Sequence, residues 1–283
     1  MDDGPKKTWV PPGHFYSPIP SADDIAAHRR ERTVPNELPG IDVREEAQLA
    51  LLARFRRYYG DQPWSAEAQP HLRYHFENPY FSYGDAIFLH CMLRDLRPRR
   101  IVELGGGFST AAMLDTIEHF LDAAVQLTCV EPHPERLESL TRPGDEKRFD
   151  LIRRATQDAP PELFSELRAG DVLFIDSTHV SKLRSDVNRL VLDVLPSLAA
   201  GVVVHFHDIF WPFEYPLAWI EENRGWNELY LLRAFLSFNP SFEIVLFNDV
   251  IGIRHLDLLE RDLPLCAKRW GGSLWLRRSE ADS

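Results

Sequence analysis

Short β-rich runs alternate with helical segments over most of the chain from residue 79 onward. Seven such runs predict strands, at 100–104, 126–130, 149–153, 171–175, 202–206, 243–247 and 273–277. Helical segments separate most of them, at 110–121, 134–140, 181–195 and 227–238. This alternation predicts an α/β fold with a seven-stranded, mostly parallel sheet and helices on both faces. Because no helix of similar length separates the last two runs, we expect the final strand to insert antiparallel.

The first part of the chain lacks this alternation. Prolines interrupt regular helix over residues 1–40, where one short helix is expected after Ser21. A longer amphipathic helix is predicted over 42–60. We therefore predict an N-terminal helical and irregular extension over residues 1–78, followed by the main domain over 79–283. The extension would either cover the site on the main domain or contact another subunit.

Composition and net charge limit the kinds of molecule that the protein is expected to bind. The chain has 283 residues, 44% of them hydrophobic, and a formal net charge of -11. An acidic balance disfavours nucleic acid or an anionic membrane as partner. Cys91, Cys129 and Cys266 are far apart, which indicates neither a disulfide framework nor a zinc site. With no signal-like start and no segment as long as a membrane span, we expect a cytoplasmic protein.

The first predicted strand leads directly into the glycine-rich sequence ELGGGFST, residues 103–110. Glycines let the chain turn sharply and let a ligand approach the backbone, and the following helix offers free N–H groups. The second strand ends at Glu131, where a carboxylate beside the same crevice can accept hydrogen bonds from ribose hydroxyls. A glycine triplet alone could be a structural turn, but the two features together predict a nucleoside-cofactor site.

The spacing of the glycines distinguishes between two classes of cofactor-binding loop. A dinucleotide fingerprint needs a third glycine where this chain has Thr110. The pattern E-x-G-x-G-x-S-T, with an acidic residue closing the second strand, instead resembles the cofactor site of class I S-adenosylmethionine-dependent methyltransferases. The resemblance spans residues 80–278 and implies a Rossmann-like sheet with S-adenosylmethionine as cofactor. An NAD(P)-dependent oxidoreductase and a non-catalytic cofactor-binding protein are the alternatives.

The resemblance implies specific cofactor contacts. Gly105 and Gly107 would lie under the methionine and ribose portions, Glu103 near the amino group and Glu131 on the ribose. Asp85 would help to hold the methionine end, with helix capping as the alternative. Residues after the third strand would contact adenine or else form a plain polar loop. The implied set is Glu103, Gly105, Gly107, Ser109, Glu131, Asp85, Gln157 and Asp158.

Polar side chains follow the fourth and fifth strands. Asp176 and His179 come after one strand, and His207 and Asp208 come after the next. Both ends fall on the carboxyl edge of a parallel sheet, so we expect these side chains to meet. Such groups form a metal site, an acid/base pair or a salt-bridged network. His205, two residues before His207, is expected to be a core residue.

The Asp-x-x-His spacing carries a second resemblance. With an acidic pair or its variant after the fifth strand, it is similar to metal-dependent O-methyltransferases that act on sugars of macrolide antibiotics. The resemblance implies Asp176 and Asp208 as magnesium ligands and His179 as general base. His207 stands where those enzymes carry a carboxylate, and imidazole suits manganese, iron or zinc better than magnesium. Either His207 points away, the metal differs, or none is bound.

These residues predict a chemistry. A metal-bound hydroxyl has a lowered pKa and a fixed direction, and imidazole, with an ordinary pKa of about 6.5, can accept its proton. We therefore expect methyl transfer to a hydroxyl of a sugar or other small metabolite, assisted by magnesium or manganese if a metal is bound. The aromatic run over 209–219 either walls the acceptor pocket or packs as a loop. A homo-oligomer is allowed for.

Overall fold

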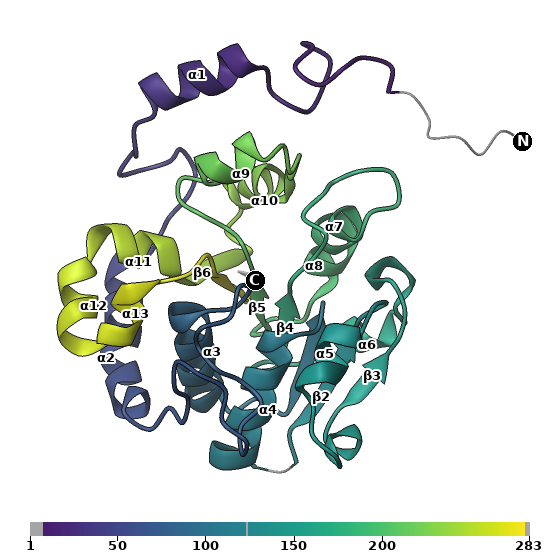
Figure 1. Cartoon of the computed structure of the whole chain (residues 1–283), viewed down its shortest axis with the longest axis vertical. Coiled ribbons are helices and arrows are strands. Elements are labelled where there is room, and N and C mark those ends of the chain that lie inside the picture. Colours follow the sequence, from purple (N-terminus) through teal and green to yellow (C-terminus); the bar gives the residue numbers. More distant parts are fainter. Residues whose placement is uncertain (1–7, 123, 281–283) are drawn as a thin grey trace, which may run out of the picture.

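The computed structural model describes residues 8–122 and 124–280. Its centre is a seven-stranded sheet with strand order β3-β2-β1-β4-β5-β7-β6 (Figure 1). The strands are β1 (Arg100–Leu104), β2 (Gln126–Val130), β3 (Asp150–Ile152), β4 (Val172–Ile175), β5 (Val203–Phe206), β6 (Phe242–Phe247) and β7 (Leu274–Arg278). β7 pairs antiparallel with both β5 and β6, and the other neighbouring strands of the sheet pair in parallel. The predicted Rossmann-like fold is confirmed.

Every predicted strand is present, with its ends displaced by a single residue at most. The reason is visible in the burial of alternate side chains, which point to opposite faces of the sheet. In β4, Val172 and Phe174 belong to the hydrophobic cluster on one face, whereas Leu173 and Ile175 belong to the cluster on the other. Because both faces are covered, these strands are continuous apolar runs in the sequence.

Helices cover both faces. They are α1 (Ala22–Glu31), α2 (Glu45–Tyr59), α3 (Tyr83–Leu96), α4 (Phe108–Phe120), α5 (Glu135–Leu140), α6 (Glu162–Ser165), α7 (Asp186–Arg189), α8 (Leu195–Ser197), α9 (Leu217–Glu221), α10 (Glu228–Leu236), α11 (Asn248–Arg254), α12 (Leu256–Asp262) and α13 (Pro264–Lys268). Residues of α2, α3, α4, α12 and α13 share one core cluster, and those of α6, α8 and α10 share the other. None of the described helices is long and apolar enough to cross a membrane.

The structure moves several predicted helix ends. α2 begins at Glu45 instead of residue 42, because Arg44 has a left-handed φ of 52°. The carboxylate of Asp42 accepts the Arg44 N–H at 2.9 Å, which forms a turn before the helix. The segment predicted to be helical over 181–195 begins its helix at Asp186 in α7 and contains a π-helical stretch at Leu190–Val194.

The connection between the last two strands contains more helix than expected. Three short helices, α11, α12 and α13, lie between β6 and β7, each shorter than α10. β7 nevertheless inserts antiparallel between β5 and β6, as predicted. The short helices place Trp270 and Gly271 against the N-terminal turn of α3, since a Cβ on Gly271 would lie 2.1 Å from Asp85 Oδ1.

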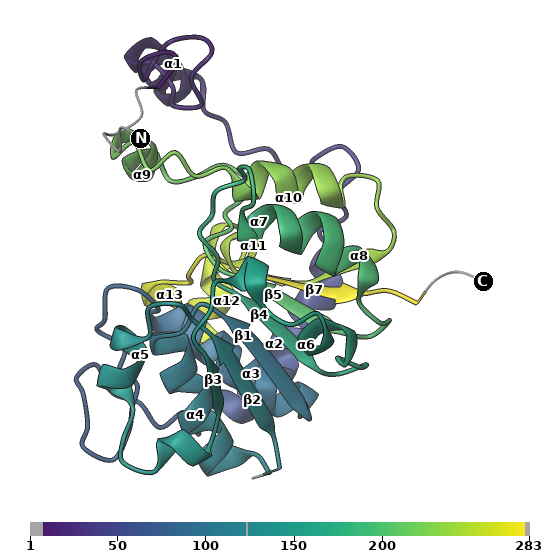
Figure 2. The same ribbon diagram turned by 90° about the vertical axis from the view of Figure 1, so that its right-hand side faces the viewer.

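The two parts of the N-terminal extension have different surroundings. α1, whose Ser21 N-cap accepts the Asp24 N–H, confirms the expected short helix and lies beside α9 at the outer end of the molecule (Figures 1 and 2). α2 instead buries Leu51, Leu52 and Phe55 in a core cluster of the main sheet. The boundary at residue 78 stays a prediction.

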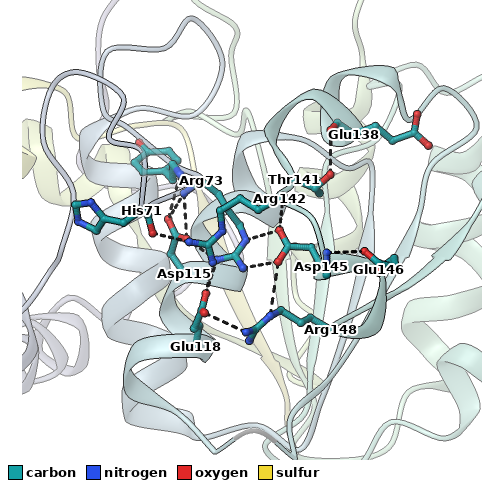
Figure 3. Close-up of polar contacts among 12 residues, drawn as sticks. His71, Arg73, Asp115, Glu118, Glu138, Thr141, Arg142, Asp145, Glu146 and Arg148 are labelled. Carbon is teal, nitrogen blue, oxygen red and sulfur yellow. Dashed lines mark hydrogen bonds and ion pairs between the residues drawn. The ribbon is translucent and has the colours of Figure 1, made fainter.

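A buried ion cluster anchors the segment between α2 and α3 (Figure 3). The Arg73 guanidinium, which is fully buried, contacts Asp115 at 2.8 Å and Glu118 at 2.7 Å, and its Nε donates to Asp145 at 2.7 Å. Burial alone would lower the pKa of Arg73, but the hydrogen bonds to these carboxylates raise it. Asp115 also accepts the indole N–H of Trp64 at 3.0 Å. The cluster ties this segment to α4 and to the turn at Asp145.

Candidate active site

The glycine loop joins the ends of two neighbouring strands. Gly105 has a φ of 87°, and a Cβ there would lie 2.2 Å from the carbonyl oxygen of Asp176. Both the backbone conformation and the close approach therefore require glycine. Its N–H donates to Val130 O at 3.0 Å, so β1, β2 and β4 meet at this point. Gly107 is the N-cap of α4.

Glu131 lies beside the glycine loop, as the parallel sheet predicts. Its Oε2 accepts the Gly106 N–H at 3.1 Å, and its Oε1 accepts the His133 N–H at 2.7 Å. The carboxylate thus stands at the end of β2 next to the backbone turn. Its contact with a ribose stays a prediction.

Glu103 holds the glycine loop in place through hydrogen bonds. Its two oxygens accept the hydroxyl hydrogens of Ser109 and Thr110, each at 2.6 Å, and the side chain is fully buried. Burial raises the pKa of Glu103 to about 8. In this arrangement Glu103 and Ser109, both implied as cofactor contacts, hold the end of β1 against the first turn of α4.

Three predicted catalytic residues come together at the carboxyl edge. The Nε2 of His179 is 3.4 Å from Asp176 Oδ1 and 3.7 Å from Asp208 Oδ2. His179 and Asp208 both have left-handed backbones, with φ of 59° and 60°. Such strain in residues other than glycine is concentrated at functional sites, because the surrounding structure must hold it in place. The expected meeting of the two loops is confirmed.

Sequence reasoning missed one member of this cluster, Glu228. It is the first residue of α10 and is buried, and its Oε2 lies 2.8 Å from Nδ1 of His179. Its other oxygen accepts the Ser177 hydroxyl at 2.8 Å. The backbone N–H groups of Asn227 and Glu228 donate to the His179 carbonyl. Glu228 lies 49 residues from His179 in the chain, and no local motif announces the contact.

The cluster shifts the protonation of its members. Burial alone would lower the pKa of His179, but hydrogen bonds with Asp176 and Glu228 raise it well above the ordinary value. Burial would raise the pKa of Asp176, yet its hydrogen bond with His179 lowers it. The neighbouring carboxylates therefore favour the protonated form of the His179 imidazole.

His207 and Asp85 extend the cluster on the side of α3. His207 Nε2 faces Asp208 Oδ1 at 3.5 Å. Burial would lower the pKa of His207, but Asp208, Asp176 and Asp85 raise it to about 9. Asp85, buried, accepts the Ser273 hydroxyl at 2.6 Å, and its burial raises its pKa to about 6. Asp85 thus accepts a hydrogen bond from the residue directly before β7. The N-cap of α3, Ser82, makes no side-chain capping hydrogen bond.

The predicted metal ligands lie in a network of carboxylates and imidazoles. Asp176 and Asp208 direct oxygens toward the Nε2 of His179, and His207 faces Asp208 and the carbonyl of Tyr80. Within the described residues, no group of three or more His, Cys, Asp and Glu side chains is arranged to hold a metal ion. Metal binding by Asp176, Asp208 and His207 stays a prediction.

The remaining predicted residues lie outside this network. The backbone of Gln157 accepts a hydrogen bond from Arg189, and exposed Asp158 faces Arg184 at 3.7 Å. Their contact with adenine stays a prediction. His205 is fully buried and stacks on Phe174 with ring centroids 3.8 Å apart, as expected of a core residue.

The aromatic run after Asp208 divides between core and surface. Trp211 and Phe213 are buried in a core cluster, and the Trp211 indole donates to Pro35 O at 2.8 Å. Tyr215 and Trp219, further along, border a cavity beneath α1. The first part of the run is a packed loop, and the second part faces a cavity.

Part of the chain matches a known family. Residues 102–209 match a family model described as a methyltransferase domain. This stretch holds the glycine loop, Asp176, His179 and Asp208. An uncharacterized protein of Archaeoglobus fulgidus is 35% identical over 131 residues, which are 44% of this chain and 58% of that protein. The chain thus spans little more than half the length of this relative.

Solved structures of low similarity also align with the chain. A methyltransferase of Podospora anserina with bound S-adenosylhomocysteine is 15% identical, with 92% of this chain and 95% of that chain covered and a TM-score of 0.43. The O-methyltransferase TomG of Streptomyces achromogenes, involved in tomaymycin synthesis and solved with S-adenosylmethionine, is 14% identical, with 91% and 96% covered and a TM-score of 0.41. At this level the likeness assigns no role to individual residues.

Proposed function

We propose that this chain, whose residues 102–209 match a methyltransferase domain, transfers a methyl group from S-adenosylmethionine to a hydroxyl of a sugar or other small metabolite. The observation that carries the proposal is the imidazole of His179. It is held at Nδ1 by Glu228 and directs Nε2 toward the carboxyl edge beside the glycine loop. An oriented base next to a cofactor turn is what hydroxyl methylation requires.

The charge of the crevice fits this cofactor. When bound, S-adenosylmethionine supplies an electrophilic methyl group on a positively charged sulfur. Asp85, Asp176, Asp208 and Glu131 line the same edge and favour a cation there. The pyrophosphate of a nicotinamide dinucleotide would instead meet these carboxylates. The acidic edge thus supports a methyltransferase over an oxidoreductase, for which the comparisons give no support.

The proposed role of His179 is to take the proton of the acceptor hydroxyl at Nε2. Glu228 accepts the Nδ1 hydrogen, which fixes the tautomer and the plane of the ring, so that Nε2 acts as the base once His179 has lost its second proton. Asp176 and Asp208 flank Nε2 and stabilise the imidazolium that forms. Asp176, Asp208 and His207 would be the ligands of a divalent metal if one is bound, and no step is assigned to it.

Two measurements test the proposal. We expect S-adenosylhomocysteine to bind the EDTA-treated protein in a calorimetric titration. We expect His179→Ala to lower methyl transfer to a panel of methyl glycosides and phenols by about a hundredfold or more, with cofactor affinity retained. His119→Ala, at an exposed histidine of α4, is the matched control and should behave as the wild type.

The outcomes separate the parts of the proposal. Failure of S-adenosylhomocysteine to bind would reject the cofactor. Binding together with undiminished turnover by His179→Ala would reject His179 as the base and leave the cofactor assignment intact.

A further inference from the structure

A cavity lies between the first part of the N-terminal extension, residues 8–40, here called the N-terminal arm, and the segment around α9. Its volume is about 450 Å³, within the range of small-molecule sites. The arm supplies one wall, with Ile25 and His28 of α1. Tyr215, Trp219 and Trp226 supply much of the opposite wall. In both views of the ribbon α1 lies next to α9, and the described part of the arm, from residue 8 onward, contributes no strand to the sheet (Figures 1 and 2).

One polar atom of the lining lacks a partner. Among the described residues, the buried Nε2 of His28 has no hydrogen-bond partner. Buried polar groups are nearly always paired, so such a group indicates a missing water or ligand. The hydroxyl of Tyr215, a residue only 3% exposed, makes no hydrogen bond of normal geometry but lies near the Leu229 backbone N–H of α10. A ligand in the cavity would satisfy the His28 nitrogen.

Contacts connect the cavity with the base. Trp226 borders the cavity, and its ring lies against the His179 ring with centroids 4.3 Å apart. Asn227, another lining residue, donates its backbone N–H to the His179 carbonyl at 2.9 Å. On the other side of His179, Asp176 touches the glycine loop at Gly105. The base therefore stands between the proposed cofactor crevice and the cavity.

We propose that this cavity is the acceptor site, that the N-terminal arm forms one of its walls, and that it takes an uncharged sugar ring. The inference rests on the proposed function and adds to it the place, the residues and the charge class of the acceptor. The acceptor hydroxyl would lie at the Trp226 end of the cavity, which is the end next to His179, whose proton transfer is the step already described.

The chemistry of the lining selects this class of ligand. A sugar ring has apolar C–H faces and a rim of hydroxyl groups. Trp219 and Trp226 contribute apolar ring surface to the lining, and the guanidinium of Arg224 lies over these two rings, 4.1 and 4.9 Å from their centroids. Glu214 and Asn223 offer oxygen acceptors to the rim. Arg224 already pairs with Glu222, so the carboxylates of the lining disfavour a phosphorylated sugar or a uronic acid.

The test measures acceptor and cofactor binding separately. In the presence of S-adenosylhomocysteine, quenching of tryptophan fluorescence is followed during titration with methyl glucoside, methyl rhamnoside, glucose 6-phosphate and glucuronic acid. Ile25→Trp fills the cavity from the arm, and Ala26→Trp adds the same side chain at an exposed neighbour of α1. Calorimetry with S-adenosylhomocysteine is repeated for both variants.

We expect saturable quenching by a neutral glycoside and at least tenfold weaker quenching by the anionic sugars, which corresponds to about 1.4 kcal/mol. Ile25→Trp should lower the glycoside affinity about tenfold or more, while Ala26→Trp does not, and both should bind S-adenosylhomocysteine as the wild type does. No quenching by any neutral glycoside, or equal binding by both variants, would overturn the inference. Failure of the wild type to bind S-adenosylhomocysteine would instead reject the proposed function.

Discussion

Glu228 and His179 show how the site depends on a single buried contact. The carboxylate of Glu228 is 2.8 Å from Nδ1 of His179 and is itself held by the Ser177 hydroxyl. An imidazole that acts as a base needs one nitrogen free and a defined tautomer. Glu228 supplies both conditions without touching the reacting atoms, so we regard it as a positioning residue.

Replacement of this carboxylate should change both the rate and its pH dependence. Because the pKa of His179 is raised, the base form gains population as pH rises, and kcat/KM should increase with pH to a midpoint above about 6.5. Glu228→Gln removes a charge that raises this pKa, so the midpoint should move to lower pH. The plateau should fall about tenfold or more, because the ring loses its fixed tautomer.

The control for this variant is Glu222→Gln, a change at an exposed carboxylate between α9 and α10. Its pH profile should match that of the wild type. A Glu228→Gln profile with unchanged midpoint and plateau would show that the contact is only structural.

Glu103 should make the free energy of unfolding fall as pH rises, whereas a carboxylate in an ordinary ion pair makes it rise. Its pKa is about 8 in the folded chain and 4.5 in the ordinary state, so between these values the folded state binds the extra proton. The free energy of unfolding should therefore fall as pH rises from about 4.5 to 8, by up to about 1.4 kcal/mol per pH unit. Glu103→Gln, which mimics the neutral acid, should flatten this slope.

Urea unfolding at a series of pH values, without cofactor, measures this slope. Glu138→Gln serves as the control, because the Glu138 carboxylate is half exposed where it pairs with Arg153. A slope that is the same in Glu103→Gln and the wild type would mean that Glu103 is ionised in the folded protein at neutral pH.

At the scale of elements, the segment between α2 and α3 is held by charge as well as by apolar packing. This segment has no regular element of its own, yet it carries Tyr80, whose carbonyl faces His207 at 3.4 Å and whose ring stacks near Phe108. The anchor is Arg73, buried among Asp115, Asp145 and Glu118. The cluster thus fixes a loop that borders the site.

Removing the guanidinium should be costly. Arg73→Met leaves Asp115 and Asp145 buried without their partner, and we expect a loss of about 3–5 kcal/mol in the free energy of unfolding. Arg153→Met, which breaks an exposed pair with Glu138, should cost less than about 1 kcal/mol. Urea denaturation of both variants makes the comparison. Equal losses would mean that water replaces Arg73 in the cluster.

At the scale of the whole molecule, a ligand that binds only the folded state should stabilise it. S-adenosylhomocysteine at about 100 times its Kd should add about 2.7 kcal/mol to the free energy of unfolding, seen as a rise in Tm. NAD⁺ at the same concentration should give no shift, because its pyrophosphate meets the acidic edge of the sheet. Scanning calorimetry with each ligand gives the comparison, and a rise with NAD⁺ alone would reverse the assignment of the cofactor.

The positions of the strands along the chain followed from the sequence because the signal for them is local. A short, continuous apolar run such as β4, buried on both faces of the sheet, involves only side chains close in the chain. Parallel strands also share one carboxyl edge, so Asp176, His179 and Asp208 could be expected to meet before any contact was known. The glycine loop was predictable for the same reason, since the turn it makes is local.

Tertiary structure alone decided the partners that lie far apart in the chain. Glu228 reaches His179 across 49 residues, and Arg73 reaches Asp145 across 72, with no periodicity to announce either contact. Packing also sets the direction of each side chain within the cluster, and it turns Asp176 and Asp208 toward an imidazole, while metal binding there stays a prediction. Local sequence determines which residues arrive at an edge, and the three-dimensional surroundings determine what each one faces.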